Sequence, residues 1–121
     1  MENDGMKNLS SSEQQRILEI LSSAKSTNWE RFSFLTDTPF SNASSMKEQF
    51  DDTSNLINSF KGEFVIESTL KHHDDGSRLI FASIIMKGST EKPIGLILHS
   101  TSEYPDSKIS IWKFYQEISF G

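Results

Sequence analysis

The 121-residue sequence contains no cysteine, which excludes disulfide bonds, thiolate nucleophiles and thiolate metal sites. It also lacks long hydrophobic runs: its apolar stretches are far shorter than the roughly 20 residues that span a bilayer. The first five residues show no basic segment leading into an apolar run, so we expect no signal peptide. These absences predict a cytoplasmic protein without a membrane partner.

Basic charge is scarce as well. Twelve Lys and Arg residues stand against 17 Asp and Glu residues, which gives a formal net charge of −5, and the two signs are mixed along the chain. The sequence therefore lacks the basic stripe with which proteins hold phosphate backbones, and we expect no nucleic-acid partner. An anionic membrane surface is an unfavourable partner for the same reason.

Motifs that identify enzymes are also missing. Neither a glycine-rich phosphate loop nor a G-x-S-x-G nucleophile elbow occurs. Metal-capable side chains lie close together in the run His72-His73-Asp74-Asp75. Adjacent strand residues point to opposite faces and the run leads into a turn motif, so we predict no metal site and no cofactor.

Helix signals fill the first half of the chain. Residues 1–9 are polar and aperiodic, and we expect a flexible tail there. Three capping-box patterns follow, at Ser10-x-x-Glu13, Thr27-x-x-Glu30 and Ser45-x-x-Glu48. In such a box a hydroxyl and a carboxylate satisfy free backbone N–H groups at a helix start. Each pattern precedes an apolar segment, so residues 10–62 are expected to form two to three helices.

The third expected helix has the clearest apolar stripe. Its members recur at helical spacing and comprise Met46, Phe50, Thr53, Ile57 and Phe60. We therefore expect this helix to contribute much of the hydrophobic core.

The second half of the chain changes to strand-like alternation. Asp75-Gly76 indicates a tight hairpin, because a primed turn needs positive φ at both central residues. Strands are expected over residues 64–71, 78–87, 94–103 and 108–118. The chain is thus predicted to be one α+β domain, 10–121, with helices (10–62) on one face of a four-stranded antiparallel meander sheet (63–121).

This order of elements resembles a known superfamily. The segments that carry the likeness are Asn28-Trp29-Glu30, Met46-Lys47-Glu48-Gln49-Phe50 and Lys61-Gly62-Glu63-Phe64. Over residues 12–118 the chain is similar to the nuclear transport factor 2-like (cystatin-like) α+β roll, particularly its small bacterial members of unknown function. The resemblance implies a fold that serves isomerases, cyclases and dehydratases as well as pocket-bearing and scaffolding proteins, so it does not fix a function.

Three functions remain open at this point. The first is a non-enzymatic binding or protein-interaction module. The second is a small-molecule isomerase, cyclase or dehydratase that uses Asp37, Asp51 or His99 as its base. The third is a small inhibitor, such as an immunity or anti-defence protein, which occupies another protein's site.

The expected turns also predict which residues share a face of the sheet. A two-residue turn at Asp75-Gly76 places Ile66 opposite Ile85, and a four-residue turn at 104–107 places Leu96 opposite Tyr115. On the helix side this register gathers small polar groups around apolar ones, which predicts a pocket for a small apolar ligand. The predicted pocket residues are Trp29, Ser68, Ser83, Ser100, Lys113 and Tyr115. The alternatives are a bulge that shifts the register, or serines that lie in water beyond the helices.

The same register predicts an apolar outer surface on the sheet. The residues expected there are Ile80, Ile84, Met86, Ile97, Trp112, Phe114 and Ile118. A sheet with one wet face should show polar residues on that face, so something must cover these side chains. We predict a homodimer joined through this face. A different protein or the N-terminal segment is the alternative cover.

Overall fold

Three helices precede four antiparallel strands along the chain, which confirms the predicted α+β class. The structure is a computed structural model and describes residues 4–117. Its elements are the 3-10 turn η1 (Asp4–Met6), the helices α1 (Ser11–Lys25), α2 (Trp29–Ser33) and α3 (Ala43–Ser59), and the strands β1 (Phe64–His72), β2 (Arg78–Met86), β3 (Ile94–Ser100) and β4 (Ile109–Gln116).

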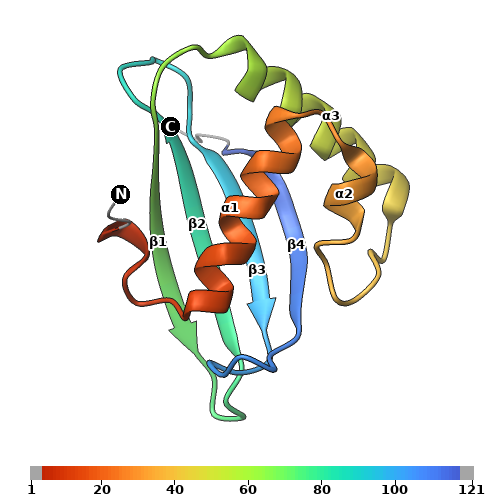
Figure 1. Cartoon of the computed structure of the whole chain (residues 1–121), viewed down its shortest axis with the longest axis vertical. Helices are drawn as coiled ribbons and strands as arrows, with labels where there is room; N and C mark the ends of the chain where they lie inside the picture. Colours follow the sequence, from red (N-terminus) through yellow and green to blue (C-terminus); the bar gives the residue numbers. More distant parts are fainter. Residues whose placement is uncertain (1–3, 118–121) are drawn as a thin grey trace.

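The strands form one open sheet in the order β1-β2-β3-β4, and the helices lie on one of its faces (Figure 1). Helix α1 crosses in front of the middle of the sheet, whereas α2 and α3 lie toward β4 (Figure 1). The opposite face, which we call the outer face, has no helix over it among residues 4–117.

One of the three predicted capping boxes is present. The Ser10 side chain accepts from the Glu13 backbone N–H, and the Glu13 carboxylate accepts from the Ser10 N–H. The other two predictions are wrong, because Asn28 and Asn42 cap α2 and α3. Asparagine is as good an N-cap as serine, and an earlier asparagine is used in preference to Ser45.

The N-terminal segment is ordered over residues 4–9, which corrects the expected flexible tail there. Met6 is completely buried and Leu9 is 6% exposed. The Ser68 hydroxyl donates to the Gly5 carbonyl at 2.7 Å. A Cβ added at Gly5 would lie 2.1 Å from the Ile66 carbonyl oxygen, so only glycine permits this close approach to β1. Only two apolar side chains, Met6 and Leu9, anchor the segment. Two residues form no periodic pattern, so the sequence did not indicate this packing.

The first hairpin is shifted by one residue from the predicted register. Ile66 pairs with Ile84 and not with Ile85, because three residues, 74–76, separate the pair His73 and Ser77. A one-residue slip moves every side chain of a strand to the other face. Consequently the predicted interface residues Ile80, Ile84 and Met86 lie in the core, at 0%, 0% and 2% exposure.

A bulge in β4 shifts the second register as well. Ile97 pairs with Lys113 while Leu98 pairs with Ile111, which leaves Trp112 as the extra residue. Trp112 and Lys113 are both exposed, and the next residue, Phe114, is fully buried. Phe114 therefore belongs to the core and not to the outer face, whereas Ile118 lies outside the described residues.

Aromatic side chains fill the space between the helices and the sheet. Phe32, Phe50 and Phe114 are fully buried, and the Phe32 ring centroid lies 4.8 Å from that of Phe50 and 5.4 Å from that of Phe114. The predicted stripe of α3 faces this core at its four helical positions, and Phe60 at the helix end is half-buried. The helix-facing side of the sheet is thus filled.

Candidate functional site

The outer face of the sheet carries large apolar side chains with no covering element in the described part of the chain. Residues of β2 and β3 alternate between buried and more accessible positions, and the accessible positions form this face. Its large apolar members are Val65, Leu79, Phe81, Ile85, Ile97 and Trp112. Phe81 is 40% exposed and Trp112 56% exposed. A patch of this kind typically marks an interaction site.

An aromatic stack stiffens one end of the outer face. The rings of His99 and Trp112 stack with centroids 5.1 Å apart and planes 3° from parallel. His99 stands on β3, and Trp112 is the bulged residue of β4, so the bulge brings the two rings together. The stack presents a rigid, amphipathic surface of the kind that anchors protein interfaces.

The edge strand β4 is closed to a further strand along much of its length. Asp37 pairs with Ile109 through two bonds of 2.8 Å: its N–H donates to the Ile109 carbonyl, and its carboxylate accepts from the Ile109 N–H. The Thr36 hydroxyl oxygen accepts from the Ile111 N–H at 3.0 Å, and the Gln49 side chain accepts from the Phe114 N–H at 3.0 Å. These side chains take the groups that an added strand would use.

At the other edge, the N-terminal segment lies against β1 at Ile66 and Ser68. Both edges are therefore at least partly covered, and the outer face is the broad surface of the sheet left open among residues 4–117.

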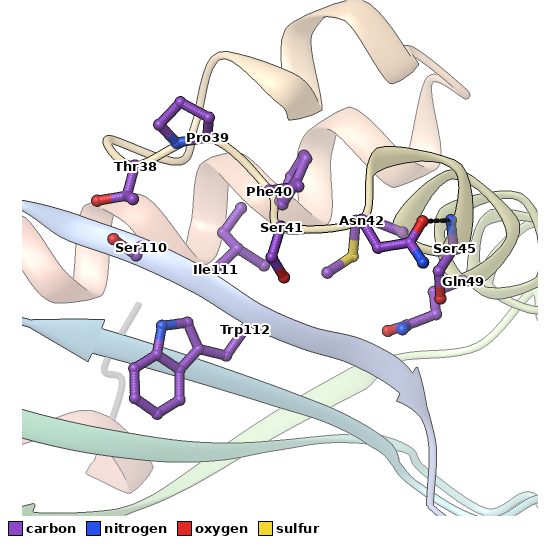
Figure 2. A pocket seen from close by; sticks show the side chains of 11 residues that line it. Thr38, Pro39, Phe40, Ser41, Asn42, Ser45, Gln49, Ser110, Ile111 and Trp112 are labelled. Atoms are coloured by element: carbon purple, nitrogen blue, oxygen red, sulfur yellow. Dashed lines mark hydrogen bonds between the residues drawn. The ribbon is translucent and has the colours of Figure 1, made fainter.

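A hollow of about 500 Å³, the loop hollow, lies between β4, the α2–α3 loop and the first turns of α3 (Figure 2). Phe40, Met46 and Ile111 line it with apolar groups, and none of its lining side chains is charged. The side-chain oxygens of Asn42 and Gln49 are already used as acceptors, in the α3 cap and on β4. The hollow could therefore hold an uncharged small molecule, but its lining has no side chain that could act as a general acid or base.

A smaller hollow of about 220 Å³, the sheet hollow, is sunk into the outer face itself. Its floor is Gly95, and Phe81, Ser83, Ile97 and Glu117 are among its walls. A Cβ added at Gly95 would lie 3.2 Å from Glu117 Cγ, so the missing side chain is what opens the depression.

The predicted pocket residues do not come together in one site. Ser68 and Ser100 lie on the helix-facing side, and their hydroxyls donate to the carbonyls of Gly5 and Ser102. Trp29 packs among the helical aromatics. Ser83 and Lys113 lie on the outer face, and Ser83 donates to Glu117. Tyr115 lies at the β4 edge, where its hydroxyl donates to Asp52 of α3 at 3.3 Å. Their separation follows from the two register shifts.

The three candidate bases also lie apart. Asp37 is held by the Ile109 N–H and lies 3.5 Å from the Arg16 guanidinium. Asp51 pairs with Lys47 at 2.8 Å on the surface of α3. His99 stacks on Trp112 on the outer face. None of the three lines either hollow.

The His72–Asp75 run belongs to the first hairpin turn. The Ser77 hydroxyl donates to Asp75 Oδ1 at 2.6 Å and the Ser77 N–H at 2.9 Å, and these bonds, the hydroxyl first, lower the pKa of Asp75 below its ordinary value. No group of three or more metal-capable side chains occurs among residues 4–117.

Comparison with known proteins gave no relative: no family model, no curated protein and no solved structure matches the chain. Within the described residues, every helix is too short or too polar to cross a membrane.

Proposed function

We propose that the protein is a non-enzymatic protein-interaction module with a roll-like α+β fold, which binds a second copy of itself through the outer face. The observation that carries the proposal is the uncovered apolar surface, above all Phe81 and Trp112 with about half of each side chain exposed. Burial of such side chains is favourable by roughly 25 cal/mol per Å². We place this activity in the cytoplasm, as the sequence predicts.

The covered edges support the same proposal. Strand addition needs a free row of backbone N–H and C=O groups, whereas β4 has Asp37, Thr36 and Gln49 in that position. A partner of this sheet is therefore better accommodated against its face than at its edge. Two-fold pairing of identical chains would cover such a face, and two-fold dimers are the commonest oligomers.

A pair of aromatic substitutions tests the proposal. Trp112→Glu places a charge in the proposed interface, where it has no partner, and should convert dimer to monomer in sedimentation velocity. Phe34→Glu changes an aromatic that is 79% exposed on the helical side and should leave the dimer unchanged. Equal dimer fractions for the two variants would refute the role of the outer face. Binding of a different protein by a monomeric chain would instead favour an inhibitor.

The loop hollow supports a second candidate function, the binding of a small apolar ligand. Five apolar side chains line a space of ligand size: Pro39, Phe40, Met46, Ile111 and Trp112. Ser45→Trp should fill the hollow and abolish binding of an apolar fluorescent dye. Ser44→Trp, at the preceding residue and outside the lining, should retain that binding. Equal dye binding by the two variants would rule the hollow out.

A further inference from the structure

Beyond the pair Val65 and Ile85 at one end, the outer face is arranged in three rows that run across the strands. The middle row, which we call the axis row, contains Thr69, Phe81, Ile97 and Lys113. On one side lies the acidic row, named for Glu67, which continues through Ser83 and Gly95. At the β4 end of this row, the Tyr115 hydroxyl donates to Asp52 of α3 at 3.3 Å. On the other side lies the basic row of Lys71, Leu79 and His99, with Trp112 stacked on His99.

From this pattern we infer that two copies pair face to face about a two-fold axis that runs along the axis row. The inference rests on the proposed self-association and specifies its geometry. Two sheets that pack face to face lie about 10 Å apart, and the strands of one run roughly parallel to the strands of the other. A two-fold axis across the strands then places the acidic row of each copy against the basic row of the other.

Charge is complementary in this arrangement. Glu67 of each copy faces Lys71 of the second copy, and the symmetry forms this pair twice. Within one chain the two residues are four positions apart on β1, or about 13 Å, so they do not pair with each other. Both are exposed. Lys113 ends the axis row on the edge strand and therefore lies beside its own counterpart, so both exposed side chains must extend past the edge into water.

Shape is complementary as well. The acidic row contains the sheet hollow, because Ser83 and Gly95 have little or no side chain there. The basic row of the second copy lies opposite this hollow and carries the bulky side chains of Leu79, His99 and Trp112. The axis row supplies Phe81 and Ile97, so apolar groups meet their own counterparts at the centre.

The area is sufficient for a dimer. Four strands spaced about 4.8 Å apart, each near eight residues long, give a face of about 500 Å² per copy. The total of about 1,000 Å² is at the minimum for a biological interface and below the roughly 1,200–2,000 Å² of stable ones, so we expect a weak, reversible dimer. Charge, shape and area together favour a second copy of this chain as the occupant of the face.

Charge reversal tests the pairing. Glu67→Lys leaves only lysines at the two facing positions, and Lys71→Glu leaves only glutamates. Each variant should dimerise about tenfold more weakly than the native chain, because two exposed pairs change from attraction to repulsion. An equimolar mixture of the two variants restores both opposite-charge pairs and should recover native affinity in sedimentation equilibrium.

Two control variants have matched net charges. Glu103→Lys, in the exposed β3–β4 turn, and Lys92→Glu, in the β2–β3 loop, change charge away from the outer face and should dimerise as the native chain does. A mixture of Glu67→Lys and Lys71→Glu that is no more dimeric than either alone overturns the inferred axis. If the native chain still dimerises in that case, the proposed function stands. A monomeric native chain overturns both.

Discussion

Glu13 and Arg78 form a buried ion pair that joins the start of α1 to the start of β2. Arg78 donates from Nε to Glu13 Oε2 at 2.8 Å and from Nη2 to Glu13 Oε1 at 3.1 Å. The two side chains are 0% and 6% exposed. Glu13 also accepts from the Ser10 N–H, and Arg78 also donates to the Asn8 carbonyl. One charge pair thus ties the N-terminal segment, a helix and the sheet together.

Replacement of Arg78 by methionine should be strongly destabilising. The Glu13 carboxylate would remain buried without its partner, and broken buried pairs cost about 3–5 kcal/mol. Urea unfolding measures the loss. The double variant Glu13→Gln/Arg78→Met removes both charges and should recover part of it. A loss below about 1 kcal/mol for Arg78→Met alone would mean that the pair does not hold these elements together.

Truncation of Phe50 tests the aromatic core. Phe50→Ala should cost about 3–5 kcal/mol, because the side chain is fully buried and packs against Phe32 and Trp29 of α2. Phe34→Ala is the matched control, since Phe34 is 79% exposed, and it should cost less than about 0.5 kcal/mol. Similar losses for the two variants in urea unfolding would contradict the packing described here.

The lowered pKa of Asp75 predicts a specific acid dependence. A carboxyl whose pKa is lower in the folded state contributes stability above its unfolded pKa and loses it as the pH falls through the folded value. Stability should therefore decline below about pH 4, and Asp75→Asn should make that decline shallower. The thermal midpoint measured from pH 7 to pH 2 provides the comparison. Parallel curves for the two proteins would exclude a contribution from Asp75.

The cover of β4 can be tested one hydroxyl at a time. Thr36→Val leaves the Ile111 N–H without an acceptor and removes the bond to the Thr38 carbonyl, so it should cost about 1–3 kcal/mol. Thr38→Val changes a neighbouring hydroxyl of the same loop and should cost less than about 0.5 kcal/mol. Equal urea midpoints for the two variants would show that the edge does not depend on Thr36.

The fold class could be predicted from sequence, but the faces of the sheet could not. Helical spacing in α3 and the Ser10–Glu13 box are local signals, and the structure confirms both. The β2 sequence is apolar at both odd and even positions, for example at Phe81 and at Ile80. Periodicity alone therefore could not choose its buried side, and the choice depended on the length of the turn.

The sequence predicted that the sheet has an apolar outer surface, but it did not predict most of the residues on that surface. Ile97 and Trp112 lie on the outer face, whereas Phe114 lies in the core because of the bulge at Trp112. No local signal marks that bulge, since it is fixed by what β4 packs against on each face. Leu79 and Phe81 on β2 were missed because the first hairpin is shifted by one residue from the predicted register.

Sedimentation velocity of the native chain over a concentration series shows whether a second copy covers the outer face. We expect a reversible rise in mass from 13.8 kDa to twice that value, with a midpoint on the order of micromolar. A single species of 13.8 kDa up to about 100 µM would contradict it.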